Sequence, residues 1–260
     1  MLKVAIMGAA GRMGHALIRC ANRIDKLTVT AALESSGHPD LGKDAGIVAG
    51  ETELGVKITD EMDTINNADV SIDFALHDAI PAHAAHAADH GIPLVVGSTG
   101  LSGEETKALE SASGSIPVVW APNMSMGINL LLSLVSKTAE SLQKEYEIEL
   151  FETHHIHKKD APSGTALKLG EYAAKARNLD PEKDILHEQQ PARGQILIHS
   201  TREGEVVGDH SVVFKSQWEE ITLSHHAISR DTFAMGALQA AQWVAYKDPG
   251  MYNMQDVLGL

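Results

Sequence analysis

Short apolar runs alternate with stretches of helical spacing from the start of the chain up to Asn123. The first run ends at Gly8 and predicts a buried strand, after which Met13, Leu17 and Cys20 fall on one face of a predicted helix. We expect strands at residues 4–7, 27–33, 70–74, 93–96 and 117–120, and helices at residues 13–24, 79–90 and 102–112. Strands and helices in alternation are typical of a parallel sheet that is covered by helices on both faces.

The pattern changes after Asn123. Residues 128–146 have the spacing of one long amphipathic helix, and residues 148–153 alternate like a strand with one exposed face. Further on, we expect a helix at residues 165–177, an exposed polar loop at 178–194, β-prone runs at 196–201, 205–214 and 220–227, and a final helix at 233–246. Long β-prone runs favour an antiparallel or mixed sheet. The sequence therefore predicts an α/β protein, with a Rossmann-like parallel sheet first and then an α+β part with an open mixed sheet.

Composition narrows the class of protein. The chain has 260 residues, 43% of them hydrophobic, and a net charge of −14 with neutral histidines. A charge of that sign repels nucleic-acid phosphates and anionic membranes, so we expect neither as a partner. Cys20 is the only cysteine, which excludes an internal disulfide and a cysteine-based metal cluster. Because no apolar run approaches ~20 residues and no signal peptide precedes the first strand, we expect a cytoplasmic protein.

A glycine motif lies between the first predicted strand and the first predicted helix. Gly8, Gly11 and Gly14 have the spacing G-x-x-G-x-x-G, which is a variant of the dinucleotide fingerprint. Glu34 ends the second predicted strand, twenty residues after Gly14, where a carboxylate accepts hydrogen bonds from a ribose diol. The alternative is a tight turn without a ligand. Strand, motif, helix, strand and acid in this order favour a dinucleotide whose phosphates meet the helix start.

The residues after Glu34 bear on the choice of dinucleotide. Ser35 and Ser36 follow it, whereas a 2′-phosphate normally meets a cation at this place, although the Arg12 side chain is long enough to reach it. We therefore favour NADH, or the use of both NADH and NADPH. A second glycine turn at residues 97–100 follows a predicted strand at its carboxyl end. It either faces the cofactor or is only a strand-to-helix turn.

Residues 152–165 concentrate groups that hold anions and move protons. They include His154, His155 and His157, and histidine titrates near neutral pH, so each can donate a proton. Lys158 adds a cation, and a Ser-Gly-Thr turn offers free backbone N–H groups where a helix begins. This set suits a small anionic substrate that must be held and protonated. Together with a dinucleotide motif, it indicates a reductase.

Other interpretations of these histidines stay open. They could bind a metal, which we favour less because no carboxylate is placed to complete an HExxH-type set. They could be solvated surface side chains, and Ser163 could be only a helix cap. His83, His86 and His90 share one face of another predicted helix, where solvated or packing histidines are the commoner case.

Taken together, the chain resembles the 4-hydroxy-tetrahydrodipicolinate reductase (dihydrodipicolinate reductase) family of the bacterial lysine and diaminopimelate pathway. The most specific part is Glu-Thr-His-His-Ile-His-Lys-Lys-Asp-Ala-Pro-Ser-Gly-Thr-Ala at residues 152–166, which is similar to the family signature almost throughout. The other matching segments are residues 8–14, 73–74, 97–100, 121–129, 229–230, 232–234 and 256–260. The resemblance therefore spans the full length.

The resemblance implies an enzyme that uses NADH or NADPH to reduce a hydroxylated ring dicarboxylate with loss of water. It implies a dinucleotide-binding domain at residues 1–124 plus 231–260, and a domain for substrate binding and oligomerisation at residues 125–230. The second domain would form the core of a homotetramer. No metal is implied.

The resemblance also assigns residues to roles. His154 is the implied proton donor, and Lys158 is its catalytic partner, which stabilises negative charge as hydride arrives. The implied substrate-binding residues are His155, Lys158, Gly164, Thr165 and Thr99. The implied cofactor-binding residues are Gly8, Ala10, Gly11, Arg12, Met13, Gly14, Glu34, Phe74, Gly97, Ser98, Thr99, Ala121, Asn123 and Met124.

The chain departs from the family pattern on the cofactor side. Ser35 stands where relatives often have an arginine, and Ala75, Leu76 and His77 stand where a cation often follows Asp-Phe. Both changes remove charge, so they weaken the expectation of an NADPH preference. Met124 replaces an aromatic residue that many relatives have.

Two other functions fit part of the pattern. A different Rossmann reductase of amino-acid metabolism, of the aspartate or homoserine dehydrogenase type, would share the glycine motif but not the His-His-x-His-Lys segment. A redox-sensing protein would bind NADH without needing an acid/base cluster. A panel of substrates separates these functions from the one that the resemblance implies.

Overall fold

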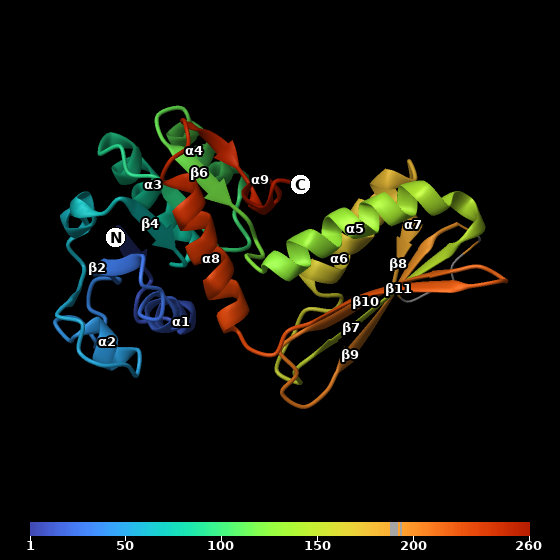
Figure 1. Cartoon of the computed structure of the whole chain (residues 1–260), viewed down its shortest axis with the longest axis horizontal. Coiled ribbons are helices and arrows are strands. Elements are labelled where there is room, and N and C mark those ends of the chain that lie inside the picture. Colours follow the sequence, from blue (N-terminus) through green and yellow to red (C-terminus); the bar gives the residue numbers. More distant parts are fainter. Residues whose placement is uncertain (188–191, 193) are drawn as a thin grey trace. The chain divides into compact units, whose positions relative to one another are not determined.

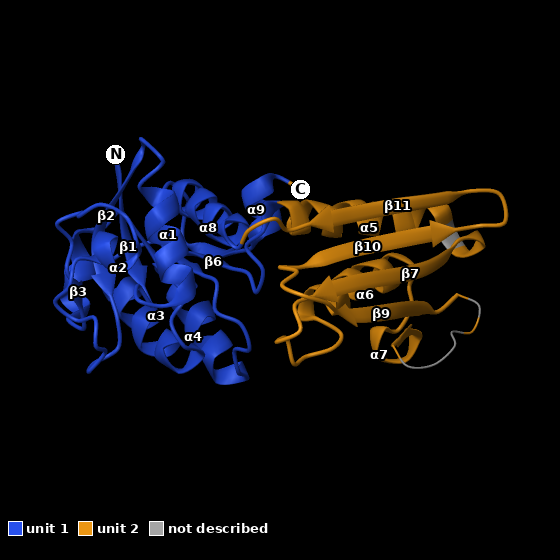
Figure 2. Cartoon of the chain, turned by 90° about the horizontal axis from the view of Figure 1, so that it is seen from below, with its two compact units in different colours: residues 1–126, 230–259 blue, residues 127–229, 260 orange. Residues whose placement is uncertain are grey.

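The computed structural model of the chain describes residues 1–187, 192 and 194–260. The chain forms two compact units (Figure 2). Unit 1 comprises residues 1–126 and 230–259, and unit 2 comprises residues 127–229 and Leu260. Within the described residues, no helix is both long enough and apolar enough to cross a membrane.

Unit 1 is built on a seven-stranded sheet in which every pair of neighbours is parallel. The strands are β1 (Leu2–Met7), β2 (Leu27–Leu33), β3 (Ile58–Thr59), β4 (Val70–Asp73), β5 (Leu94–Val96), β6 (Pro117–Trp120) and β12 (Gly250–Tyr252). Their order is β12-β6-β5-β4-β1-β2-β3. Apart from β12, this is the strand order of dinucleotide-binding Rossmann folds, so the predicted Rossmann-like sheet is confirmed.

Helices cover both faces of the unit 1 sheet, as Figure 1 shows. The helices are α1 (Arg12–Ala21), α2 (Ala45–Val48), α3 (Ile80–Asp89), α4 (Gly103–Ser113), α8 (Asp231–Val244) and α9 (Met254–Leu258), with short 3-10 turns at Met62–Asn67 and His77–Ala79. Strand β1 shows why both faces are apolar: Val4 and Ile6 join the core under α1 and α8, whereas Ala5 and Met7 join the core under α3 and α4. A strand that is buried on both faces has a continuous apolar sequence, and the apolar run that ends at Gly8 predicts such a strand.

Unit 2 contains a five-stranded mixed sheet with the order β11-β10-β7-β9-β8. The strands are β7 (Glu147–His154), β8 (Ile185–Leu186), β9 (Ile196–Arg202), β10 (Asp209–Lys215) and β11 (Glu220–His226). The unit's helices are α5 (Met126–Leu142), α6 (Gly164–Ala176) and α7 (Pro181–Asp184), and a 3-10 turn at Gln143–Glu145 follows α5. Helices α5 and α6 share one apolar core with the sheet, which leaves its other face open, so the predicted mixed sheet is confirmed (Figure 2).

The central strand β7 carries the alternation that places the candidate site. Ile148 and Leu150 are buried in the core, whereas Phe151 on the opposite face is 42% exposed. Glu152 and His154 continue the buried face, because side chains two residues apart in a strand point the same way. Two polar side chains are therefore enclosed at the end of an apolar stripe.

The structure corrects several expected elements. The predicted loop at residues 178–194 contains helix α7 and strand β8, while its residues 188–191 and 193 lie outside the described residues. The long helix expected at residues 128–146 ends at Leu142, and the strand expected from Glu205 begins only at Asp209. These elements are short or end within polar sequence, where local periodicity carries little information.

Strand β12 was not predicted. It has three residues and pairs in parallel with β6. So short a run has no period of its own, and it becomes a strand because it lies beside an existing sheet edge.

Candidate active site

The glycine motif forms the turn from β1 into α1. Gly8 has a φ of +75°, and a side chain there would bring a Cβ to 2.9 Å from the backbone nitrogen of Ala75. A Cβ on Gly14 would lie 2.3 Å from the carbonyl oxygen of Gly8 and 2.4 Å from that of Ala9. Atoms do not approach so closely, so both positions require glycine. The turn is therefore as tight as a dinucleotide-binding loop needs to be.

The start of α1 is open to a phosphate. Its N-cap residue, Gly11, has no side chain to cap the first N–H groups, and no acidic side chain lies in the first turn. Helix starts of this kind bind anions through free N–H groups and the positive end of the helix dipole. Arg12 and Met13 occupy the first positions of this helix and are exposed and half-buried, respectively.

Glu34 follows β2 and is tied to the glycine loop. One carboxylate oxygen, Oε2, accepts a hydrogen bond from the backbone N–H of Ala10 at 3.0 Å, and Oε1 accepts one from Ser35 at 2.9 Å. The acid that would bind the ribose diol is thus already held beside the loop that would bind the pyrophosphate.

A hollow of about 400 Å³ lies beside Gly8 and Glu34. Its apolar lining suits a nucleobase. That lining comprises Leu33, Met62, Ala75, Leu76 and Ala79. The titratable side chains of its lining are the carboxylates of Glu34, Asp60 and Asp78 and the imidazole of His83. No lysine or arginine lines it among the described residues. The hollow is therefore suited to an adenosine with a free ribose diol.

A larger hollow of about 870 Å³ lies elsewhere on unit 1. It is lined by residues at or just before the amino ends of strands, such as Leu2, Lys26, Asp69 and Pro93. Ligands of open parallel sheets bind at the carboxyl ends of the strands. The smaller hollow, beside the carboxyl ends of β1 and β2, is therefore the candidate cofactor site.

Other predicted cofactor residues lie at the carboxyl ends of β4 and β5. Phe74 packs directly on Gly97, where an added Cβ would lie 2.1 Å from the phenyl ring. Ser98 is buried and donates a hydrogen bond to the carbonyl of Ala75 at 2.7 Å, whereas Thr99 is exposed. The structure thus brings Phe74, Gly97 and Ser98 together at the edge of the sheet where a nicotinamide would lie.

The segment after β6 is packed more deeply. Ala121 is buried and Asn123 is half-buried. The Met124 side chain is only 1% exposed and belongs to the apolar core of unit 1, against Gly236 of α8. A methionine in place of an aromatic residue here fills a core position.

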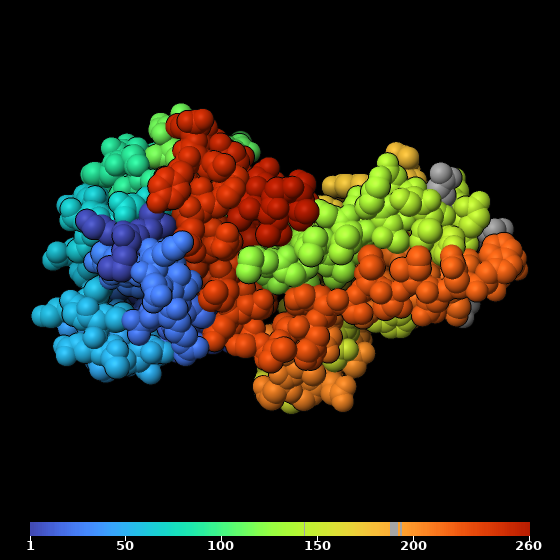
Figure 3. Space-filling model, viewed as in Figure 1, coloured from blue at the N-terminus to red at the C-terminus, as the bar shows by residue number. Residues whose placement is uncertain are grey.

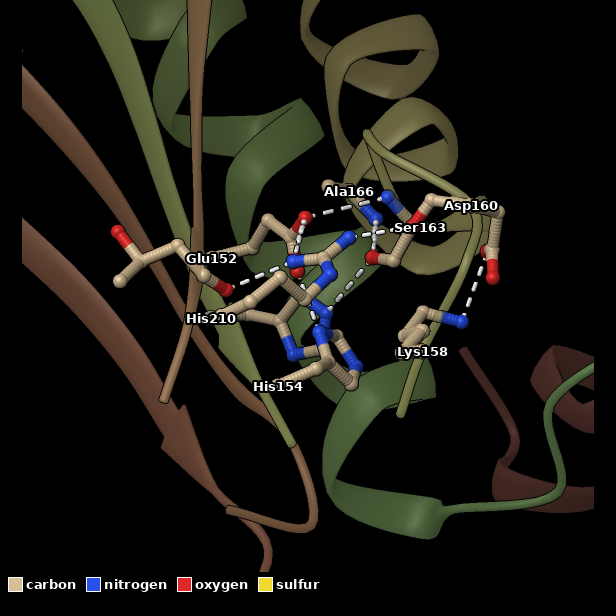
Figure 4. Close-up of polar contacts among 9 residues, drawn as sticks. Glu152, His154, Lys158, Asp160, Ser163, Ala166 and His210 are labelled. Carbon is tan, nitrogen blue, oxygen red and sulfur yellow. Dashed lines mark hydrogen bonds and ion pairs between the residues drawn. The ribbon is translucent and has the colours of Figure 1, made fainter. Parts of the chain in front are cut away.

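The predicted catalytic segment lies wholly in unit 2 and centres on Glu152 (Figure 4). His154 Nδ1 forms a short hydrogen bond with Oε2 of Glu152. Oε1 of Glu152 accepts from Arg202 Nη1 at 2.9 Å and from the backbone N–H of Ser163 at 3.3 Å. Arg202 lies opposite His154 on β9, and His210 lies opposite Glu152 on β10. The sheet register therefore assembles the cluster.

Glu152 is an ionised carboxylate in the interior. Burial by itself would raise its pKa, but hydrogen bonds from His154, Ser200 and Arg202 outweigh that effect and lower the pKa from 4.5 to about 2. Because its side chain is fully buried, its charge is screened little by solvent. The negative charge beside the His154 ring is therefore permanent at physiological pH.

His210 is the second buried imidazole. Burial, followed by the nearby His154, lowers its pKa from 6.5 to about 3, so it is neutral at physiological pH. Its ring meets that of His154 edge to face, with the centroids 5.1 Å apart. Its Nε2 lies 3.3 Å from Ser163 Oγ. His210 therefore packs against His154 without adding charge.

Lys158 is held on the loop that leads to α6. Its Nζ forms an ion pair with Asp160 at 2.7 Å, and the ammonium lowers the pKa of that carboxyl. The Lys158 side chain is 23% exposed. A carboxylate already pairs with this cation, so an anionic ligand would compete with Asp160 for it.

The start of α6 is the remaining part of the predicted site. Ser163 is the N-cap, and its Oγ accepts from the backbone N–H of Ala166 at 3.1 Å. Gly164, which is exposed, and Thr165, which is half-buried, begin the helix. Helix capping and a predicted anion site therefore coexist in one turn. His155 is also half-buried on this segment, whereas Thr99 belongs to unit 1.

Two groups among the described residues have ligand atoms close enough together to hold a metal ion. In unit 2 they are Glu152, His154 and His210, but the Arg202 guanidinium already bonds to that carboxylate. A cation beside a fixed guanidinium would be repelled, so this group fits a hydrogen-bonded network better. The other group is Asp63, His86 and His90, at the surface of unit 1.

Sequence reasoning assigned no role to Glu152, Arg202 or His210, and it considered Ser163 only as a helix cap or as part of the anion-binding turn. A signal existed for Glu152, which stands two residues before His154 on a predicted strand and so must share its face. Arg202 lies 50 residues after Glu152 along the chain, and His210 lies 58 residues after it. Their place beside β7 depends on strand order.

Comparisons with known proteins cover the whole chain. Residues 2–124 match the family model described as dihydrodipicolinate reductase, N-terminus, and residues 127–258 match that described as dihydrodipicolinate reductase, C-terminus. The 4-hydroxy-tetrahydrodipicolinate reductase of Anaeromyxobacter dehalogenans is 43% identical over 266 residues, covering 100% of this chain and 98% of the relative. The enzyme of that name from Nitrosospira multiformis is 44% identical over 265 residues, with the same coverage.

Solved structures share the fold at lower identity. A dipicolinate-bound dihydrodipicolinate reductase from Paenisporosarcina sp. TG-14 superposes with a TM-score of 0.79 at 23% identity, covering 98% of each chain. An amine dehydrogenase from Mycobacterium smegmatis reaches a TM-score of 0.66 at 10% identity, covering 97% of this chain and 95% of its own. The fold is thus shared by enzymes with different names, and it does not select among them. The two family models distinguish among these enzymes, and together they span nearly the whole chain. The chain belongs to the dihydrodipicolinate reductase family.

Proposed function

We propose that this chain reduces 4-hydroxy-2,3,4,5-tetrahydrodipicolinate to tetrahydrodipicolinate, with loss of water, in the synthesis of diaminopimelate and lysine. The observation that carries the proposal is the full-length family match together with the buried cluster that its most specific segment forms around Glu152 and His154. Unit 1 is the dinucleotide-binding domain and unit 2 the substrate-binding and oligomerisation domain.

The reaction needs one hydride and one proton, and the ring hydroxyl leaves as water. When bound, the reduced nicotinamide supplies the hydride. The residues that would hold this cofactor are those of the glycine motif, Glu34, and the groups at the ends of β4, β5 and β6: Gly8, Ala10, Gly11, Arg12, Met13, Gly14, Glu34, Phe74, Gly97, Ser98, Thr99, Ala121, Asn123 and Met124. The tight turn and the uncapped start of α1 support this set.

His154 donates the proton that follows the hydride. Its Nδ1 is engaged with Glu152, so the proton is delivered from Nε2. A positioned general acid of this kind contributes on the order of a hundred- to ten-thousandfold in rate. Lys158 stabilises the negative charge that develops on the substrate as hydride arrives.

The substrate is a small dicarboxylate. In unit 2, His155, Lys158, Gly164 and Thr165 hold its carboxylates. The family resemblance also assigns Thr99, a residue of unit 1, to substrate binding. Cationic and N–H groups gathered in an otherwise acidic chain support an anionic ligand. The dipicolinate-bound relative points the same way, because dipicolinate is itself a dicarboxylate.

NADH, or the use of both NADH and NADPH, is the favoured cofactor use. The carboxylates of Glu34, Asp60 and Asp78 around the adenosine hollow would repel a 2′-phosphate, and no lysine or arginine lines that hollow among the described residues. Ser35, where relatives often have arginine, lines it as well. Steady-state kinetics with each cofactor tests this preference, and a strong preference for NADPH would overturn it.

The working form is a homotetramer in the cytoplasm. The open sheet face of unit 2 exposes Phe151, and the edge strand β11 exposes Ile221 on the opposite face, where it pairs with Phe214. Helix α5, which reaches the surface in Figure 3, exposes Leu130 and Leu134. Large apolar side chains exposed on neighbouring elements favour association. Sedimentation equilibrium tests the stoichiometry, and a monomer at assay concentration would contradict it.

The decisive assay follows loss of the reduced cofactor's absorbance while the preceding synthase generates substrate from pyruvate and aspartate semialdehyde. We expect absorbance loss that requires the synthase and disappears in the double variant His154→Ala/Lys158→Ala. A protein that binds NADH but consumes none with this substrate would instead support a redox sensor. Turnover of another substrate in a panel would support an aspartate- or homoserine-type dehydrogenase.

A further inference from the structure

The two ring nitrogens of His154 have different surroundings. Nδ1 is bonded to Oε2 of Glu152. Nε2 faces Gly208, where an added Cβ would approach it to 3.0 Å. The absence of a side chain at Gly208 thus keeps the space beside Nε2 clear. Among the hydrogen bonds of the described residues, His154 uses only Nδ1, so Nε2 is the nitrogen left for a reacting group.

The two oxygens of Glu152 also have different partners. Oε1 accepts from Arg202 Nη1 at 2.9 Å and from the backbone N–H of Ser163 at 3.3 Å. Both partners are obligate donors, since neither a guanidinium nor a backbone N–H can accept a hydrogen bond. The Ser200 hydroxyl also donates to this carboxylate, but a hydroxyl can donate or accept, so it does not fix which oxygen faces the ring. Oε2 is left to face His154. A carboxylate only accepts, so the Nδ1 atom that it faces must carry a hydrogen.

We propose that Glu152 is a positioning residue that holds neutral His154 in its Nδ1–H tautomer, and that Arg202 and the Ser163 N–H fix which carboxylate oxygen faces the ring. This inference rests on the proposed role of His154 as proton donor. In that tautomer Nε2 is the atom that gains and loses the catalytic proton, at the side kept open by Gly208. Hydrogen-bonded partners of this kind set both the tautomer and the ring orientation of catalytic histidines.

Buried electrostatics supports an accepting carboxylate. The pKa of Glu152 lies at about 2, so the group is ionised at any pH at which the enzyme would work. His210, the other ring beside His154, is neutral. The contact from Glu152 to Nδ1 is therefore the one charged hydrogen bond that the described residues make to His154.

The test is the variant Glu152→Gln. The donors around Oε1 determine how the glutamine amide is oriented, and so which tautomer His154 adopts. Because two donors still point at the Oε1 position, the glutamine carbonyl oxygen stays there and the NH₂ group takes the place of Oε2. That group donates to Nδ1 and so reverses the tautomer, placing the hydrogen on Nε2. We expect turnover to fall by about a hundredfold or more, with a smaller change in KM, because neutral His154 can then no longer take up a proton at Nε2.

The tautomer is read directly from ¹⁵N spectra of the histidine rings, at alkaline pH, with the His154 signals assigned by their loss in His154→Gln. We expect Nδ1–H in the wild type and Nε2–H in Glu152→Gln. The matched control is Glu149→Gln on the same strand: Glu149 also pairs with a histidine, His199, at 3.1 Å, but at the surface. This control should change neither the His154 signals nor turnover.

Two results would overturn the proposal. One is the observation of an Nε2–H tautomer in the wild type. This measurement needs no Glu152 variant, so it decides the matter even if Glu152→Gln does not fold. The other is a folded Glu152→Gln protein that keeps the wild-type tautomer and turnover within about twofold of the wild type. Failure of the proposed function is a separate result, because a wild type that reduces no substrate can still show the predicted tautomer.

Discussion

The two candidate binding regions of this chain are built from different kinds of chemical groups. In unit 1 the cofactor edge consists mainly of glycines, backbone N–H groups and one carboxylate, Glu34, held by the backbone of Ala10. In unit 2 the catalytic region consists of buried ionised and neutral side chains, Glu152, Arg202 and His210 among them, arranged around His154.

This difference follows from what each region must do. A pyrophosphate is bound by close approach and by helix-start N–H groups, so added atoms are what harm the cofactor edge. A proton must be delivered from one defined atom, so the catalytic region is harmed by a change of functional group even when its volume is kept. We therefore expect added bulk to do most harm at the cofactor edge. We expect a change of functional group at constant volume to do most harm in the catalytic region.

The largest expected effect is the loss of a charge from the catalytic region. Lys158→Ala should lower turnover by about a hundred- to a thousandfold and change KM less, because its charge matters most when negative charge develops in the transition state. Steady-state kinetics measures both constants. The matched control is Lys159→Ala, which removes the adjacent exposed lysine and should leave turnover near wild type. Wild-type turnover in Lys158→Ala would contradict the assignment.

A methyl group added to the cofactor edge comes next. Gly14→Ala should lose about 1–3 kcal/mol of stability from overpacking against two carbonyl oxygens, and with it most of its affinity for NADH. Thermal unfolding and NADH fluorescence titration measure the two effects. Gly103→Ala is the control, because nothing lies within 4 Å of the added Cβ at the start of α4. Equal NADH affinity in both variants would show that bulk does not limit this edge.

A smaller effect is expected when charge is added beside the adenosine hollow. Ser35→Arg should raise kcat/KM for NADPH by about tenfold, because a charge-assisted hydrogen bond to the 2′-phosphate adds roughly 1.5–3 kcal/mol against the opposing carboxylates. The value for NADH should change little. Ser111→Arg, on the surface of α4, is the matched control. If both variants raised NADPH use alike, net charge alone would explain the gain.

The last expected effect is measured in stability, not in activity or cofactor use, and it depends on pH in the catalytic region. His210 binds its proton near pH 3 in the folded protein but near pH 6.5 when unfolded. Between these values the unfolded state takes up the extra proton, so this group's contribution is present above pH 6.5 and is lost as the pH falls toward 3. The loss reaches about 1.4 kcal/mol per pH unit. His210→Gln should flatten this part of the stability curve in denaturant titrations.

The control for this pH effect is His199→Gln, which alters an exposed histidine on the neighbouring strand β9. Its stability should follow the wild-type pH dependence. An unchanged slope in His210→Gln would mean that His210 is not held neutral in the folded protein.

The sequence by itself determined the parallel sheet of unit 1, the mixed sheet of unit 2, the family, and the segment that carries His154 and Lys158. The central strands of the first sheet include continuous apolar runs such as Leu94–Val96, and β7 alternates, so local periodicity is enough to identify them. The helix predicted at residues 102–112 also begins with a local signal, because the capping box of α4 joins Ser102 and Glu105, which are three residues apart.

Only the tertiary structure decided which groups surround His154. Arg202 and His210 reach Glu152 because β9 and β10 flank β7 in the register observed, and no local pattern specifies which strands become neighbours. The same reason explains β12, whose three residues become a strand only beside β6. Local spacing fixes which face of an element a side chain occupies, whereas the partner on that face is set by burial of the whole sheet, which depends on contacts far apart along the chain.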